Sequence, residues 1–168
     1  MQLRRATLSD VPLLKRWNNS AHVIAAIGSD RIWDWQRLID SDPAEREVVI
    51  AEVDGRAIGM IQVIDPAREE DHYWGEVEDN LRAIDIWLSE SSDVGHGLGT
   101  QMMRLALQRS FAHPHVRAVV VDPLSSNARA HRFYQRLGFR AVERRLFGTD
   151  DCIVFRIDRA DWERPSPR

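Results

Sequence analysis

The stretch IDIWLSESSDVGHGLG, residues 84–99, carries the strongest structural signal in the chain. It begins as an apolar strand that contains one carboxylate, Asp85, and it ends on the glycine turn 96–99. Residues 100–111, TQMMRLALQRSF, contain no Gly or Pro and form an amphipathic helical pattern. A glycine turn at a helix N-terminus presents free N–H groups and the positive end of the helix dipole, which favours a phosphate. The same glycines also suit a plain tight corner, so this stretch alone leaves both interpretations open.

The composition is that of one ordinary globular domain, residues 1–168. Hydrophobic residues make up 43% and charged residues 29% of the 168 residues. The formal charge of −3 argues against a nucleic-acid-binding protein. The single cysteine excludes an internal disulfide and fits the reducing cytoplasm, and the six histidines lack metal-ligand spacing. No segment has the roughly 18 apolar residues of a membrane span, and the N-terminus does not resemble a signal peptide.

Periodicity and turn signals predict a mixed sheet flanked by helices. Strands are expected at 2–6, 47–53, 57–64, 81–88, 116–122, 139–146 and 152–157. Helical segments are expected after the cap Ser9–Asp10, and at 22–27, 33–39, 100–111 and 126–136. The early strands are joined by a hairpin and the later strands alternate with helices, so an α/β (α+β) domain with a mixed sheet is expected.

Two motifs in the second half of the chain identify a family resemblance. VGHGLG at 94–99 resembles the pyrophosphate loop of the GCN5-related N-acetyltransferase (GNAT) superfamily. Asn127, Tyr134 and Gly138–Phe139 in DPLSSNARAHRFYQRLGF, residues 122–139, match its second signature. The resemblance implies a GNAT fold, with a mostly antiparallel mixed sheet and acetyl-CoA in a notch between splayed central strands.

The GNAT resemblance also implies a set of cofactor-binding residues. The pyrophosphate is expected on the glycine turn, and the backbone near Trp87 is expected to polarise the acetyl carbonyl. Asn127 either bonds the pantetheine arm or caps the helix that follows it. The expected acetyl-CoA residues are Ile86, Trp87, Leu88, Val94, Gly95, His96, Gly97, Leu98, Gly99, Thr100, Asn127 and Arg129.

A narrower resemblance points to the aminoglycoside 6′-N-acetyltransferases. It rests on Tyr73–Trp74, the acids that follow them, Ile84–Asp85, GHGLGT and Asp122–Pro123. It implies transfer of an acetyl group to the 6′-amine of a kanamycin-like antibiotic, with Asp85 as general base and Tyr134 as general acid. It also implies substrate contacts from Asp122 and from a late carboxylate, Asp150 or Asp151. Tyr73 stands where these enzymes often have tryptophan, and Gly75 where they have an acid.

The local charge is consistent with a polycationic substrate. Residues 69–85 contain seven carboxylates and one basic residue, Arg82. A surface of one charge sign concentrates and orients a polycation, although such a run also suits a solvated loop. The expected substrate-binding residues are Glu70, Tyr73, Trp74, Glu76, Glu78, Asp85, Asp122, Asp150 and Asp151.

Asp85 is out of place in an apolar strand. If Ile84 and Ile86 face one side of the sheet, Asp85 and Trp87 share the other. A carboxylate in a buried strand is costly unless it is paired, so Asp85 either faces a cationic amine or is satisfied by an arginine. Aspartic acid in water has a pKa near ~3.9, far below that of an alkylammonium ion. Asp85 is therefore expected to act as an electrostatic anchor, or as a base through water, rather than as a strong direct base.

Two other functions remain open at this stage. One is acetylation of another amine, such as a siderophore lysine derivative, a polyamine or a protein N-terminus. The other is a non-catalytic CoA-binding sensor, although such a sensor gives no reason for both Asp85 and Tyr134. The expected protein is a cytoplasmic monomer or homodimer that needs no metal, nucleic acid or membrane.

Overall fold

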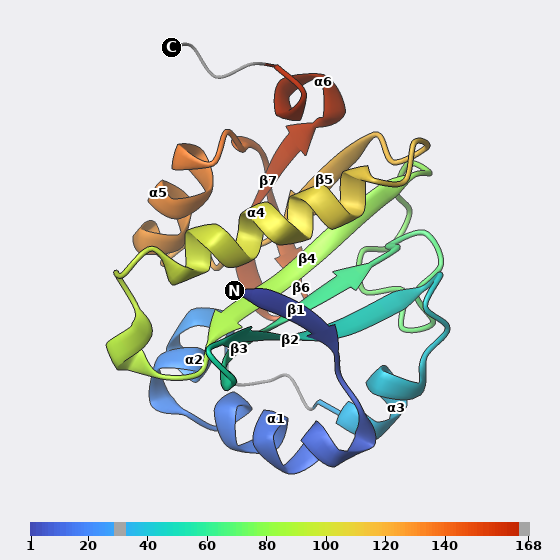
Figure 1. Cartoon of the computed structure of the whole chain (residues 1–168). Helices are drawn as coiled ribbons and strands as arrows, with labels where there is room; N and C mark the ends of the chain where they lie inside the picture. Colours follow the sequence, from blue (N-terminus) through green and yellow to red (C-terminus); the bar gives the residue numbers. More distant parts are fainter. Residues whose placement is uncertain (29–32, 165–168) are drawn as a thin grey trace.

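A seven-stranded mixed sheet forms the centre of the molecule (Figure 1). The computed structural model describes residues 1–28 and 33–164. The strands lie in the order β1 (Gln2–Arg5), β2 (Arg46–Val53), β3 (Arg56–Ile64), β4 (Leu81–Leu88), β5 (Ala118–Val121), β7 (Asp150–Asp158) and β6 (Arg140–Phe147). Neighbouring strands are antiparallel except β4 and β5, which are parallel. The predicted mostly antiparallel mixed sheet is confirmed.

Helices cover both faces of this sheet (Figure 1). They are α1 (Val11–Asn18), α2 (Ala21–Ile27), α3 (Trp35–Asp40), α4 (Leu98–Phe111), α5 (Ala128–Arg136) and α6 (Arg159–Trp162), with short 3-10 turns η1 (Leu8–Asp10) and η2 (Ser91–Asp93). The four-residue α6 was not predicted, because one turn is too short to show helical periodicity. Of the described helices, none is long and apolar enough to cross a membrane.

The two faces of the sheet follow the alternation of side chains along each strand. On β2, Val49 and Ala51 pack in the core beneath α4, while Val48 and Ile50 pack beneath α1, α2 and α3. β5 is buried on both faces, as its continuous apolar run predicts. The loop 65–80 adds Trp74 to a third cluster, which covers the β4–β5–β7 side of the sheet.

β4 and β5 separate near the centre of the sheet. Their ladder runs from the pair Leu81–Ala118 to the pair Ala83–Val120. β4 stays paired with β3 as far as the pair Gly59–Leu88. Residues 84–88 therefore continue past the end of the β5 ladder, and the predicted notch between splayed strands lies here.

Gly59 is required where β3 passes the end of β4. A Cβ at this position would lie 2.5 Å from the Trp87 carbonyl oxygen and 2.8 Å from the Met102 side chain. No side chain fits in that space, because real Cβ atoms do not approach other atoms so closely. This close approach lets β3, the end of β4 and α4 pack together at Gly59.

Candidate active site

A cleft of about 550 Å³ lies at the end of β4, between the glycine turn, α2 and α5. Ten of the twelve predicted acetyl-CoA residues line it. They are Ile86, Trp87, Leu88, Val94, Gly95, Gly97, Gly99, Thr100, Asn127 and Arg129. The other two side chains do not line the cleft, since Leu98 packs against the core and His96 is exposed to solvent.

The glycine turn presents the start of α4 to this cleft. Gly97 is the N-cap of α4 and has a left-handed backbone with φ of 81°. A glycine has no side chain to cap the helix, so the N–H groups of the first turn stay available to an anion. The helix begins at Leu98, two residues earlier than predicted, which places Gly99 and Thr100 in that first turn. A cleft of this size with such a turn fits the pyrophosphate and pantetheine of acetyl-CoA.

Several cleft residues were not predicted from the sequence. α5 contributes Phe133 and Arg136, which lie four and seven residues after Arg129 and so share its helix face. That spacing was a usable signal. α2 contributes His22, whose ring Nε2 lies 2.9 Å from the Leu88 carbonyl oxygen. Nothing in the local sequence signals that α2 packs at the end of β4. The remaining unpredicted lining residues are Val23, Ala25, Ala26, Ser126 and Ala130.

Asn127 fulfils the capping role that its position allowed. Its side-chain oxygen accepts a hydrogen bond from the Ala130 N–H at 3.0 Å and caps α5. It also lines the cleft. The cap fixes the entry into α5 and so the placement of Tyr134 two turns later.

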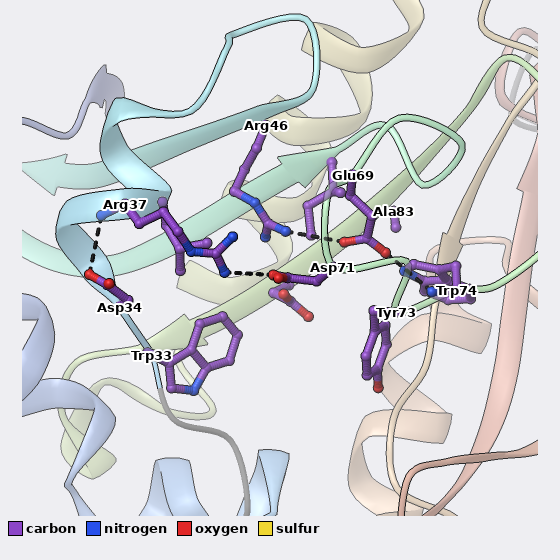
Figure 2. Close-up of a pocket in the computed structure, with 12 residues that line it drawn as sticks. Trp33, Asp34, Arg37, Arg46, Glu69, Asp71, Tyr73, Trp74 and Ala83 are labelled. Atoms are coloured by element: carbon purple, nitrogen blue, oxygen red, sulfur yellow. Dashed lines mark hydrogen bonds and ion pairs between the residues drawn. The ribbon is translucent and has the colours of Figure 1, made fainter.

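A second cavity, of about 200 Å³, lies farther back along β4, beside Ala83 and Asp85 (Figure 2). Its walls are aromatic and charged, and they come from α3, the central strands and the loop 65–80. The charged lining residues are Asp34, Arg37, Arg46, Glu69, Asp71 and Asp85, and the aromatic ones are Trp33, Tyr73 and Trp74. Among the described residues, carboxylates therefore outnumber guanidinium groups in this pocket. We call it the acidic pocket.

A smaller cavity of about 90 Å³, called here the linking cavity, shares lining residues with both the acidic pocket and the cleft. Asp85 lines both this cavity and the acidic pocket, while Tyr134 lines both this cavity and the cleft. Asp122, at the end of β5, also lines it. The splay of β4 and β5 thus brings the two predicted catalytic residues to one junction.

Asp85 lies on the face of the sheet that the alternation predicted, next to a buried polar chain. Gln62 on β3 is its cross-strand neighbour and lies 3.5 Å from it, from Nε2 to Oδ2. Arg46 donates to the side-chain oxygen Oε1 of Gln62 at 2.8 Å and to Glu69 Oε2 at 3.1 Å. Gln62 and Glu69 are 0% and 1% exposed, so the hydrogen bonds of Glu69, Arg46 and Gln62 hold the Gln62 amide next to Asp85 from inside the protein.

The Tyr134 hydroxyl group lies in a strongly desolvated position. Burial raises the pKa of Tyr134 well above its usual value of 10, and the charges of Asp122 and Asp85 raise it further. Each of these effects disfavours the anionic phenolate. Tyr134 is therefore a neutral hydrogen-bond donor across the physiological pH range.

Tyr73 and Asp122 are joined across the site. The Tyr73 hydroxyl donates to Asp122 Oδ2 at 2.6 Å, and its ring stacks on Phe147 at 4.7 Å. Trp74 is buried and packs edge-on against Phe147. The rings of Tyr73 and Trp74 are thus packed against Phe147, and the Tyr73 hydroxyl group holds the Asp122 carboxylate in place.

Most of the acidic run is neutralised within the protein. Glu70 and Asp71 both bond Arg37, Glu69 bonds Arg46, and Glu78 bonds Arg156 on β7. Burial raises the pKa of Glu69. The expected one-sign surface is therefore a set of ion pairs, because arginines distant in sequence fold onto the loop.

Five predicted substrate residues lie outside the acidic pocket and the linking cavity, and the first of them, Glu70, is exposed. Glu76 is exposed, and Glu78 faces β7. Asp150 lies against Gly28, where an added Cβ would meet its carboxylate at 3.0 Å. Asp151 bonds Arg144 and the Ser125 hydroxyl, and the Arg144 guanidinium group holds the pKa of that carboxyl well below its usual range.

The described residues contain no group of three or more His, Cys, Asp or Glu side chains that could hold a metal ion. The site is instead built from carboxylates, a phenol and backbone amides, which suits acid–base and electrostatic chemistry on an amine.

The chain is similar to known acetyltransferases. The profile of the acetyltransferase (GNAT) domain family matches residues 6–147. The aminoglycoside N(6′)-acetyltransferase type 1 of Klebsiella pneumoniae is 33% identical over 145 residues, which are 82% of this chain and 72% of that protein.

Solved structures of aminoglycoside acetyltransferases superpose on nearly the whole chain. AAC(6′)-Ib with paromomycin and acetyl-CoA gives a TM-score of 0.86 at 30% identity, covering 97% of this chain and 96% of that one. The same enzyme with coenzyme A and kanamycin gives a TM-score of 0.84 at 27% identity, covering 96% of each chain. The chain belongs to the GNAT family of acetyltransferases.

Proposed function

We propose that this protein is an aminoglycoside 6′-N-acetyltransferase that confers antibiotic resistance. It transfers an acetyl group from acetyl-CoA to the 6′-amine of kanamycin-like aminoglycosides by direct attack in a ternary complex. One observation carries the proposal: an acidic pocket and a phosphate-type cleft meet at a cavity lined by both Asp85 and Tyr134. The full-length likeness to enzymes crystallised with these ligands supports the choice of substrate.

The cleft residues hold the cofactor and fix its reactive end. Acetyl-CoA supplies the activated acetyl group when it is bound. N–H groups of the glycine turn and the first turn of α4 bind the pyrophosphate, and Arg129 and Arg136 add positive charge nearby. Residues 86–88, beyond the end of the β5 ladder, orient the acetyl carbonyl through their peptide groups.

Asp85 attracts and orients the substrate amine at the junction. Its carboxylate lines the route between the acidic pocket and the cleft, so a bound ammonium group is held beside the acetyl carbonyl. The proton leaves the amine through Asp85 or a water that it binds, because the amine must be neutral to attack. Asp122 and its partner Tyr73 hold a second cationic group of the substrate.

Tyr134 donates its proton toward the leaving sulfur. Its raised pKa keeps the phenol protonated, and its position on the cleft side of the junction faces the leaving group. A neutral donor stabilises developing negative charge without requiring a charged acid in a buried site.

Walls of the acidic pocket select a cationic sugar. Asp34 and Asp71 supply charge, while Trp33 and Tyr73 supply flat faces for sugar rings and cation–π contact. The single cysteine, Cys152, is buried and free, which fits a cytoplasmic enzyme. The enzyme acts as a monomer or homodimer.

A thiol-release assay with acetyl-CoA tests the proposal. Kanamycin, tobramycin and gentamicin should each release CoA thiol, and spermidine should release little. Turnover restricted to spermidine or peptides would contradict the antibiotic substrate. Acetyl-CoA binding without thiol release on any amine would contradict an enzymatic role.

A further inference from the structure

Two arginines lie among the carboxylates of the acidic pocket, and their environments differ. Arg46 is inside the protein, and the side chains of its pair with Glu69 are 6% and 2% exposed. Arg37 lines the pocket and extends from α3 to Asp71 in the loop 65–80 (Figure 2). Its Nη2 lies 2.7 Å from Asp71 Oδ2, and its Nη1 lies 3.3 Å from Glu70 Oε2.

The Arg37 contacts can be exchanged for solvent or for another cation. The side chains of Arg37 and Asp71 are 43% and 49% exposed, and that of Glu70 is 77% exposed. Exposed pairs are weak, since water competes for both partners. The backbone of Arg37 is fixed, because its N–H donates to Asp34 at the N-cap of α3. The side chain can therefore leave Asp71 without loss of the helix.

We propose that Arg37 is a resident counter-ion that a polycationic substrate must displace from Asp71, and that this competition sets the affinity for the substrate. This inference rests on the proposed function and deepens it. An ammonium group of the substrate and the guanidinium group of Arg37 compete for the Asp71 carboxylate. Once displaced, the guanidinium group lies near the positively charged substrate and repels it. Arg37 also lowers the pKa of Asp71, as a guanidinium group beside a carboxylate does.

Two substitutions separate the charge of Arg37 from its shape. R37Q removes the competing cation, so the KM for kanamycin should fall about twofold to fivefold, the range expected from an exposed pair. The KM for acetyl-CoA and kcat should not change. R37K keeps the cation and should stay near wild type. R140Q is the matched control, because Arg140 on β6 is also exposed and bonds two carboxylates, Asp158 at the end of β7 and Asp161 on α6.

Salt provides an independent readout of the same competition. At roughly 1 M NaCl the Debye length is about 3 Å, so the difference in KM between wild type and R37Q should largely disappear. A merely structural role for Arg37 predicts a higher KM in R37Q at every salt concentration. An unchanged or higher KM in R37Q, or an equal fall in R37K, would overturn the inference.

Calorimetric titration of kanamycin into the CoA-bound protein separates this inference from the proposed function. If wild type binds kanamycin without turnover and R37Q binds it more tightly, the counter-ion role stands and the proposed function fails. If wild type acetylates kanamycin and R37Q binds it no more tightly, the function stands and the counter-ion role fails. If wild type neither binds nor acetylates kanamycin, both fail.

Discussion

At the scale of single residues, Tyr134 and Asp85 divide the proposed chemistry between two sides of one junction. The sequence placed Tyr134 two helical turns after Asn127, and the structure explains the placement, since Asn127 caps the helix that carries it. The sequence did not reveal how strongly Tyr134 is desolvated. That property comes from α5 packing onto the sheet, with Phe139 and Phe155 beside the ring.

Removal of the Tyr134 hydroxyl tests its role as a proton donor. Y134F should lower kcat by about 100-fold, the lower end for general acid catalysis, with the KM for acetyl-CoA little changed. Because the pKa of Tyr134 is raised, the acid form persists below that pKa, and wild-type kcat should not fall through tyrosine ionisation up to pH 10. Initial rates from pH 6 to pH 10 check both statements. A Y134F enzyme with wild-type kcat would contradict the role.

At the scale of elements, the strands and the longer helices could be predicted from local patterns. The apolar run of β5 and the alternation in β4 identify buried strands because side-chain direction has a period of two residues. Strand β4 was predicted with the bounds observed, Leu81–Leu88. The long-range contacts could not be predicted, since Arg37 reaches Asp71 and Arg46 reaches Glu69 only through the fold.

A substitution at Gly59 tests the close packing of β3 against the end of β4. G59A should destabilise the protein by about 1–3 kcal/mol, the usual cost of overpacking, because the new methyl group meets the Trp87 carbonyl. It should also raise the KM for acetyl-CoA, because residues 86–88 line the cleft. Urea unfolding and initial rates measure the two effects. G55A is the control, because its Cβ would meet nothing within 4 Å, so only the strain of its positive φ remains. Equal stability of G59A and wild type would contradict the close approach.

The start of α1 depends on a charged link to the sheet. Arg4 on β1 donates two hydrogen bonds of 2.8 Å to Asp10, which lowers the pKa of Asp10 from 3.8 to about 2. A lowered pKa in the folded state stabilises the protein above pH 4, and this contribution is lost as the pH falls from about 4 to 2. The shift corresponds to about 2 kcal/mol.

D10N tests this link through its pH dependence. The variant should lose about 2 kcal/mol of unfolding free energy at pH 7 and roughly half of that at pH 3, measured by urea titration. E163Q, which breaks an exposed pair with Arg159, should cost less than about 0.5 kcal/mol. A D10N loss that is the same at pH 7 and pH 3 would show that the ion pair is not its cause.

At the scale of the whole molecule, the fold brings two binding sites together along one strand, β4. The cleft lies where β4 leaves β5, and the acidic pocket lies beneath α3 and the loop 65–80. Sequence motifs indicated both sites, but only the fold shows that a third cavity joins them beside Asp85 and Tyr134. In the proposed mechanism, the substrate amine must therefore reach the cleft from the acidic pocket.

The most direct measurement is thiol release with kanamycin and with a matched analogue that carries a hydroxyl group in place of the 6′-amine. Steady release of CoA thiol is expected with kanamycin, and background release with the 6′-hydroxy analogue, at concentrations where calorimetry shows both bound. Equal thiol release with the two compounds would contradict acetylation at the 6′-amine. No release with kanamycin despite binding of both substrates would contradict the proposed enzyme.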